Sequence, residues 1–170
     1  REYCTFNRGT VQGGGVTRVG SDNWIMAYVH IAHDCIVRNH AIMANGSTLA
    51  GHVSVGDHVV FGAFTVVHQF CDIGAHALSA MGTVVLKDVP PYVTVSGNSA
   101  QPHGINAEGL RRRNFSAEAI RGIRRAYKTL YKQGLGLEEA KAVLREQQPA
   151  VPELAVLVDF LSRSERGIVR

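Results

Sequence analysis

A short histidine-rich segment holds the side chains of this chain that are best suited to acid–base chemistry. His30, His33 and Asp34 fall in the sequence His-Ile-Ala-His-Asp, and Gly51 and His52 follow eighteen residues after His33 and Asp34. A histidine can take up and return a proton near neutral pH, and a neighbouring carboxylate can orient it. A glycine offers a backbone N–H without a Cβ, and such an N–H can stabilise a developing oxyanion. A base and an oxyanion donor together indicate acyl transfer to a hydroxyl group.

A six-residue repeat supplies the elements that would position these groups. Stepping by six from Val19 to Val85 gives twelve positions, and eleven of them are apolar. An α-helix has 3.6 residues per turn and cannot keep a period of six on one face. A parallel β-helix can, because each hexad forms one flat side and one corner. The sequence therefore predicts a mainly β fold, a left-handed parallel β-helix (a hexapeptide-repeat solenoid), over residues 1–91.

Three hexads make one coil, so equivalent positions recur every eighteen residues. Gly51 then lies one coil above His33, at the strand spacing of about 4.8 Å. The same arithmetic places His30, His33, His52 and His68 around one corner of successive coils, where we expect a single cleft. A polar patch between subunits and a zinc site shared by two subunits are the alternatives. The sequence lacks the tetrad of cysteines and histidines typical of a closed zinc site.

Two other sets of residues follow from the coil arithmetic. His40, His58 and His76 are spaced by eighteen, so they form one corner row, which we interpret as plain corner residues rather than as a metal site. Cys35 and Cys71 lie two coils apart, or about 9–10 Å, which is beyond the reach of a disulfide. We interpret both as core residues of a protein in a reducing compartment.

The second half of the chain has a different pattern. Pro90 and Pro91 end the repeat, residues 92–108 are expected to form a connector loop, and residues 109–170 a small α-helical C-terminal domain. Ser116 is the expected N-cap of a helix that ends near Gly134 or Gly136. Two more helices are expected over about 137–147 and 152–164. The chain starts as if a coil were already in progress, so we expect upstream coils that are missing here.

Charge is concentrated in the helical part. The net charge is +4, and eight basic residues stand against the single acidic Glu118 between Arg111 and Lys132. This basic block consists of Arg111, Arg112, Arg113, Arg121, Arg124, Arg125, Lys128 and Lys132. It favours an anionic partner, although a solvated helix face is the alternative. No nucleic-acid-binding motif, signal peptide or membrane span is recognisable.

Several motifs together resemble one enzyme family. The matching segments are Asn7–Gly15 (Asn-Arg-Gly-Thr-Val-Gln-Gly-Gly-Gly), His30–Asp34, Gly51-His52, Val67–Cys71, Lys87–Val93, Gly97-Asn98, Asn106–Leu110, Arg111–Ser116 and Arg166–Arg170. The chain resembles the UDP-N-acetylglucosamine O-acyltransferase family, which begins lipid A synthesis in Gram-negative bacteria. The resemblance covers the whole chain, and the family has further coils upstream.

The resemblance implies a cytoplasmic homotrimer with its site between neighbouring β-helices. The donor would be a 3-hydroxyacyl group on acyl carrier protein, and the acceptor the glucosamine 3-hydroxyl of UDP-N-acetylglucosamine. No metal or other cofactor is implied. His33 would be the general base, Asp34 would orient it, and the Gly51 N–H would hold the oxyanion. The implied binding residues are His30 and His52 (acceptor or acyl group), His68 and Gln69 (nucleotide side), and Asn106, Glu108, Arg112 and Arg113 (uridine diphosphate). The basic block would dock the carrier protein.

At two positions the sequence departs from the family pattern. Asn114 stands where the family often has glycine. Met81 also replaces a glycine of several members, so we expect it to shorten the acyl groove and favour chains of about ten to twelve carbons over about fourteen. The alternative is that Met81 is a core residue.

Three other functions are the alternatives to O-acyl transfer. They are the N-acyltransferase that acts on the 2-amine in the same pathway, a metal-dependent β-helix enzyme, and a non-catalytic scaffold that binds carrier protein.

Overall fold

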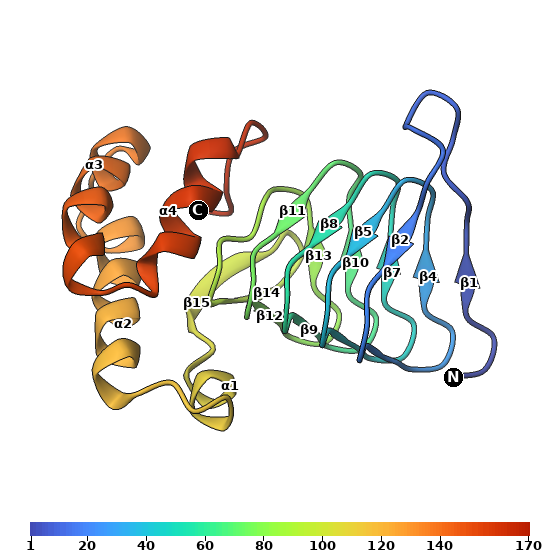
Figure 1. Cartoon of the computed structure of the whole chain (residues 1–170), viewed down its shortest axis with the longest axis horizontal. Coiled ribbons are helices and arrows are strands. Elements are labelled where there is room, and N and C mark those ends of the chain that lie inside the picture. Colours follow the sequence, from blue (N-terminus) through green and yellow to red (C-terminus); the bar gives the residue numbers. More distant parts are fainter.

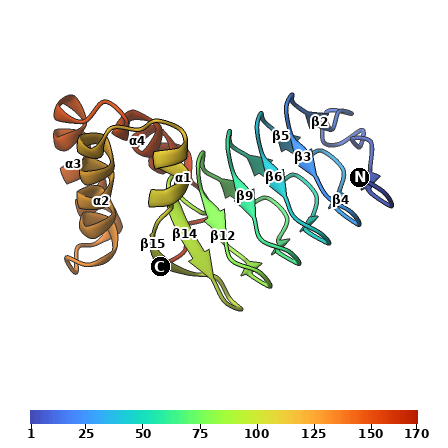
Figure 2. The same ribbon diagram turned by 90° about the horizontal axis from the view of Figure 1, so that it is seen from below.

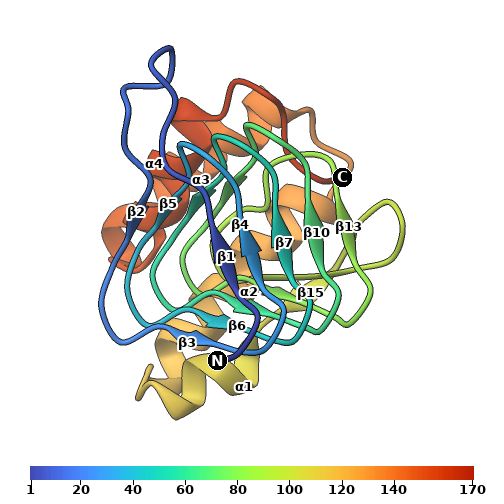
Figure 3. The same cartoon turned by 90° about the vertical axis from the view of Figure 1, so that its right-hand side faces the viewer.

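The computed structural model describes residues 1–170 as a stack of coils with helices packed on one end (Figure 1). Thirteen strands of two residues each, β1 to β13, build the coils. Viewed along the coil axis, they form three walls around a common core (Figure 3). A long loop projects between β1 and β2 (Figure 1). The chain is therefore a parallel β-helix, as its six-residue repeat predicts, followed by α-helices.

Each wall is one sheet. The first sheet holds β1 (Thr5–Phe6), β4 (His30–Ile31), β7 (Thr48–Leu49), β10 (Val66–Val67) and β13 (Val84–Val85). The second holds β2 (Arg18–Val19), β5 (Ile36–Val37), β8 (Ser54–Val55) and β11 (Asp72–Ile73). The third, which Figure 2 shows most clearly, holds β3 (Trp24–Ile25), β6 (Ile42–Met43), β9 (Val60–Phe61), β12 (Leu78–Ser79), β14 (Val93–Ser96) and β15 (Gln101–Ile105).

The strand register confirms the eighteen-residue coil. His30 pairs with Thr48, and Thr48 pairs with Val66, in parallel. Two places depart from this spacing. Thr5 pairs with His30, twenty-five residues on, because the projecting loop adds seven residues to that coil. Leu78 pairs with Thr94 after only sixteen residues. Both changes fall in the connections and leave the strand positions on their walls.

Side chains alternate between core and surface within each two-residue strand. From β4 to β13 the second residue points inward and is buried, as Ile31, Leu49 and Val85 illustrate. Cys35 and Cys71 are buried free thiols, which confirms their prediction as core residues. Burial raises the pKa of the Cys71 thiol to about 11, so this group stays protonated at neutral pH.

Between β2 and β13 every corner turns through a residue with positive φ, and these residues recur every six positions. The series is Asp22, Tyr28, Asp34, His40, Gly46, His52, His58, Phe64, Phe70, His76 and Gly82. Left-handed backbone is costly for most side chains, and Asp and His tolerate it better than others. Stacking offsets part of the cost. The rings of His40 and His58 are stacked at 4.7 Å, and those of His58 and His76 at 4.9 Å, which confirms the predicted corner row.

Residues 92–108 differ from the connector loop predicted for them. β14 and β15 pair in antiparallel fashion and extend the third sheet. The sequence Val-Thr-Val-Ser alternates buried and partly exposed side chains, which is typical of a strand. Asn106 then caps α1 (Ala107–Arg112), a helix that begins two residues before the predicted helical domain. The Asn106 side chain accepts from the Gly109 N–H at 3.0 Å and donates to the His76 carbonyl, so it ties α1 to the corner row.

The remaining helices match their predicted positions within a few residues. α2 spans Ala117–Tyr131, α3 spans Leu137–Gln147, a short 3₁₀ turn covers Gln148–Ala150, and α4 spans Leu154–Arg163. Ser116 is the N-cap of α2, as predicted, because its hydroxyl accepts from the Ala119 N–H. The helices share a second core that includes Leu130, Leu144 and Phe160. None of them is long and apolar enough to cross a membrane.

Candidate active site

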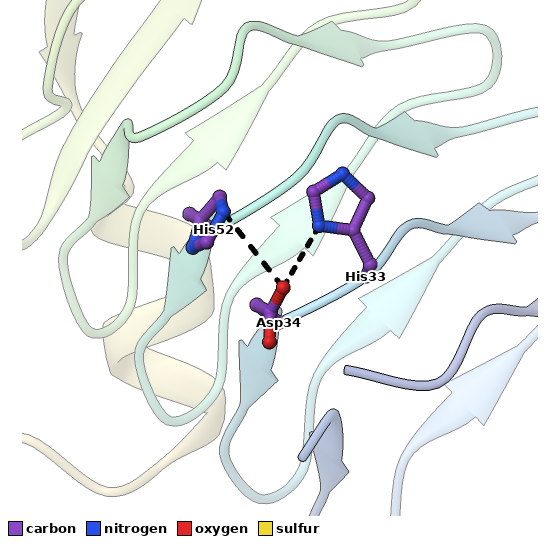
Figure 4. A group of neighbouring side chains, drawn as sticks. All are labelled: His33, Asp34 and His52. Carbon is purple, nitrogen blue, oxygen red and sulfur yellow. Dashed lines mark hydrogen bonds and ion pairs between the residues drawn. The ribbon is translucent and has the colours of Figure 1, made fainter. Parts of the chain in front are cut away.

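Three polar side chains meet at the corner between the first and second sheets (Figure 4). His33 and Asp34 follow β4, and His52 follows β7 on the next coil. The His33 Nδ1 atom lies 2.9 Å from the Asp34 Oδ2 atom, and the His52 Nε2 atom lies 3.8 Å from the same oxygen. The two imidazoles meet edge to face at 5.1 Å. The coil register thus brings together three residues that were singled out from the sequence.

Asp34 is the fixed centre of this group. Its side chain is only 2% exposed, and it accepts from the Thr10 backbone N–H at 3.0 Å and from the Thr10 hydroxyl at 2.7 Å. Its own N–H donates to the Thr17 hydroxyl at 2.8 Å. Burial works against the charged form, but the hydrogen bonds from His33 and Thr10 outweigh it, and the pKa of Asp34 lies below its ordinary value. Asp34 is therefore an ionised carboxylate with a defined direction.

An ionised Asp34 decides which nitrogen of His33 carries the proton. A carboxylate only accepts hydrogen bonds, so His33 must donate to it through Nδ1. This leaves the lone pair on Nε2 free. The His33 side chain is 41% exposed, and its only hydrogen bond within the protein uses Nδ1. The group consequently has the geometry of an oriented general base.

Gly51 lies directly against the His33 ring. A Cβ built on Gly51 would come within 2.5 Å of His33 Cε1 and 2.7 Å of Nε2, so only glycine leaves room for the ring. The neighbouring His52 N–H donates to the His33 carbonyl, whereas no protein group accepts from the Gly51 N–H. An unpaired backbone N–H next to a general base is suited to hold an oxyanion.

His52, the third residue of the group, packs against an aromatic side chain. Its ring is stacked on Phe70 at 4.5 Å, and its side chain is 27% exposed. The ligand atoms of His33, Asp34 and His52 lie within 4.8 Å of one another, a set that could also hold a divalent cation. The Thr10 bonds to Asp34 are independent of any cation.

The other predicted histidines line the first sheet without joining this group. The His30 Nδ1 atom lies 2.7 Å from the Thr5 hydroxyl. His68 follows β10, and its Nδ1 atom lies 2.9 Å from Arg166 Nη2. Gln69 is exposed beside it. The four histidines therefore do not form one hydrogen-bonded group within this chain: His33 and His52 meet Asp34 at the corner, and His30 and His68 have other partners. The single cleft expected around all four stays a prediction.

The residues expected to bind uridine diphosphate lie at a different corner, between the second and third sheets. Asn106 is buried and occupied as the α1 cap. Glu108 is exposed and pairs with Arg111 and Arg112, which lower its pKa. Arg113 donates to the carbonyls of Gly109 and His58. Within a single chain, these residues therefore do not lie next to His33.

Met81 and the basic block are both on the surface. Met81 follows β12 and is 75% exposed, so the alternative that it is a core residue is wrong. Part of the basic block lines an open hollow of about 570 Å³ between α1 and α2, with Arg111, Arg121 and Arg124 around Phe115 and Ile120. Asn114 also lines it and has a positive φ of 62°, a backbone conformation that glycine adopts without strain.

Sequence reasoning missed the residues that hold Asp34 and His68. Thr10 and Thr17 belong to the projecting loop and its return, off the six-residue repeat. Arg166 lies ninety-eight residues from its partner. The coil arithmetic applies only to residues in register, so it gave no signal for these three.

Comparisons with known proteins agree with the geometry. Residues 88–169 match the model of UDP N-acetylglucosamine O-acyltransferase, domain 2, and residues 17–51 match the bacterial transferase hexapeptide model. The chain is 57% identical over 170 residues to the acyl-[acyl-carrier-protein]–UDP-N-acetylglucosamine O-acyltransferase of Thiobacillus denitrificans. It is 51% identical over 171 residues to that of Stenotrophomonas maltophilia.

Solved structures give the same result. LpxA from Acinetobacter baumannii aligns over 100% of this chain with a TM-score of 0.97 and 48% identity, and UDP-N-acetylglucosamine acyltransferase from Francisella novicida aligns over 98% with a TM-score of 0.96 and 43% identity. The chain spans 66% of the length of the Thiobacillus relative, and 66% and 61% of the two solved chains. Identity and fold agree along its whole length. The chain therefore belongs to the UDP-N-acetylglucosamine O-acyltransferase family.

Proposed function

We propose that this protein transfers a 3-hydroxyacyl group from acyl carrier protein to the 3-hydroxyl of UDP-N-acetylglucosamine, the first step of lipid A synthesis. The observation that carries the proposal is the contact between the His33 ring and Gly51, with Asp34 fixing the ring from behind. The name of the Thiobacillus denitrificans relative gives the same carrier protein as donor and the same acceptor.

In the proposed reaction, His33 acts through its free Nε2 atom. It removes the proton from the sugar hydroxyl as the oxygen attacks the thioester carbonyl carbon, and the imidazolium that forms is stabilised by Asp34. The carbonyl oxygen becomes an oxyanion and accepts from the Gly51 N–H. When the intermediate collapses, the carbon–sulfur bond breaks and the leaving sulfur takes the proton from Nε2. The products are the sugar ester and the free carrier thiol, and His33 is regenerated.

We further propose that the working form is a cytoplasmic homotrimer with sites between subunits. The two groups of implied binding residues lie at different corners of one chain, so one ligand can contact both only if a second copy supplies one corner. Asn106, Glu108, Arg112 and Arg113 would then hold the uridine diphosphate opposite His33 of the neighbour. His30 in the first sheet, and His52, His68 and Gln69 at its corner with the second sheet, would complete the site. The arginines suit phosphate because of their planar donor geometry.

The basic block is the proposed dock for the carrier protein, because clustered arginines attract an acidic partner. Met81 is the proposed limit of the acyl groove. It follows β12 and precedes β13 of the first sheet, whose outer face includes the partly exposed Val66. An acyl chain that leaves the His33 corner along this face would end at the Met81 side chain.

The proposal is tested by acyl transfer from 3-hydroxyacyl carrier proteins to UDP-N-acetylglucosamine. We expect transfer to the 3-hydroxyl by the parent protein and a loss of at least about 1,000-fold in kcat for His33→Ala, with unchanged circular dichroism and oligomeric mass. Retained activity in this variant would remove His33 as the base. Transfer to the amine of a 2-amino acceptor instead would favour the N-acyltransferase.

The metal-dependent alternative is tested separately. Zinc at one equivalent in active protein, with activity lost on chelation, would assign the three-residue group to a cation and overturn the base assignment. Activity that survives chelation would support the base.

A further inference from the structure

The last residues of the chain, 164–170, run from the helical domain to the last coil and back, and we call them the C-terminal strap. In Figure 1 the strap is the red segment that loops towards the coils after α4. The Asp88 N–H donates to the Gly167 carbonyl at 3.1 Å, and the Val169 N–H donates to the Asp88 carbonyl at 2.9 Å. The Ser164 hydroxyl donates to the buried Asp88 carboxylate at 2.6 Å. These contacts hold the strap without using the side chain of Arg166.

Arg166 extends from the strap to the first sheet. Its Nη2 atom lies 2.9 Å from His68 Nδ1, and its Nε donates to the Leu86 carbonyl at 3.2 Å. A guanidinium is always charged and only donates hydrogen bonds. Nδ1 must therefore be the accepting nitrogen of His68 in this contact. Neutral imidazole has one proton, so that proton lies on Nε2.

A second neighbour of the same nitrogen favours the opposite tautomer. The Gln69 carbonyl oxygen lies 3.1 Å from His68 Nδ1, and a carbonyl only accepts. A proton on Nδ1 would satisfy Gln69 but would face the Arg166 donor. The two contacts cannot both be hydrogen bonds in the neutral ring. The presence or absence of the guanidinium thus decides between two tautomers of one exposed histidine.

We propose that Arg166 is a positioning residue that selects the Nε2–H tautomer of His68. His68 then presents an N–H donor, rather than a lone pair, to a phosphate oxygen of the sugar nucleotide bound along the first sheet. This inference rests on the proposed function, in which His68 lines the nucleotide side. It assigns to the terminal Arg-Gly-Ile-Val-Arg segment a role at a site that lies on the β-helix.

The tautomer is read directly by nitrogen NMR of the full chain labelled with ¹⁵N-histidine, with His68→Gln identifying the signal. In the parent protein we expect the pattern of a protonated Nε2 and an unprotonated, accepting Nδ1. Arg166→Met should convert His68 mainly to the Nδ1–H form, and Arg166→Lys should retain much of the parent pattern because a lysine can still donate. Arg145→Met, which removes an exposed arginine of α3, is the matched control and should change nothing.

Kinetics test the substrate contact. Arg166→Met should raise KM for UDP-N-acetylglucosamine about tenfold, the loss expected for one hydrogen bond, with kcat within about twofold of the parent. The same tautomer in parent and Arg166→Met, or an unchanged KM, overturns the inference. If the parent protein transfers no acyl group at all, the proposed function fails, and the NMR comparison still decides whether Arg166 sets the tautomer.

Discussion

Replacing Gly51 by alanine tests the base and its geometry in one step. The added Cβ would lie 2.5 Å from His33 Cε1, whereas ordinary contacts of such atoms begin near 3.4 Å. The ring must therefore retreat by about 1 Å. Gly51 has no positive φ, so its backbone accepts alanine, and the N–H is retained. The substitution moves the proposed base and leaves the proposed oxyanion donor in place.

A displacement of about 1 Å at a reacting group costs about 100-fold in rate. We expect Gly51→Ala to lower kcat/KM by about this factor, which is about 2.7 kcal/mol of transition-state stabilisation. The assay is acyl transfer to UDP-N-acetylglucosamine at subsaturating acceptor. Thermal unfolding of the same samples reports whether the coil is intact.

Gly136→Ala is the matched control. A Cβ at Gly136 would approach nothing closer than 3.4 Å, and this residue lies at the start of α3, away from the site. Its activity should equal that of the parent. If the activity of Gly51→Ala stays within threefold of the parent, the close contact between His33 and Gly51 is not required for the reaction, and the reasoning is refuted.

Two further outcomes are expected. Met81→Gly should shift the ratio of kcat/KM about tenfold from acyl chains of about twelve carbons towards those of about fourteen, because two more methylenes find room; an unchanged ratio would dismiss Met81 as the limit of the groove. Stability should fall with acidification. Burial, together with His58 and Arg113, lowers the pKa of His76 to about 4, so only the unfolded chain takes up this proton between that value and 6.5. Between pH 7.5 and pH 5 the free energy of unfolding should drop by about 2 kcal/mol more in the parent than in His76→Asn, measured by urea titration. Parallel losses in the two proteins would contradict this account.

The part of the structure that follows the repeat was predictable, since position in the coil determines position in space. The contact of His33 with Gly51, the row from His40 to His76 and the burial of Cys35 and Cys71 all follow from spacings of eighteen or its multiples. Helix α2 was predictable for a different reason, because Ser116 and the apolar period after it are local signals.

What could not be predicted depends on segments that leave the repeat. Thr10 reaches Asp34 only because the loop after β1 folds back over the corner, and nothing in its composition encodes that return. β14 and β15 were missed because residues 92–108 were expected to form a connector loop, whereas residues 97–100 form the turn of a hairpin between two strands. The contact of Arg166 with His68 requires the helical domain to be placed first.

The eighteen-residue register also restricts how such a protein can change in length during evolution. Deleting or duplicating one whole coil shifts everything beyond it by about 4.8 Å and keeps every side chain on its own wall. An insertion or deletion of an odd number of residues within a strand would turn inward residues outward. Insertions are then confined to connections such as the loop between β1 and β2, which adds seven residues while β1 still pairs with β4. The distance between the corner that holds His33 and the helical domain can therefore change only in whole coils.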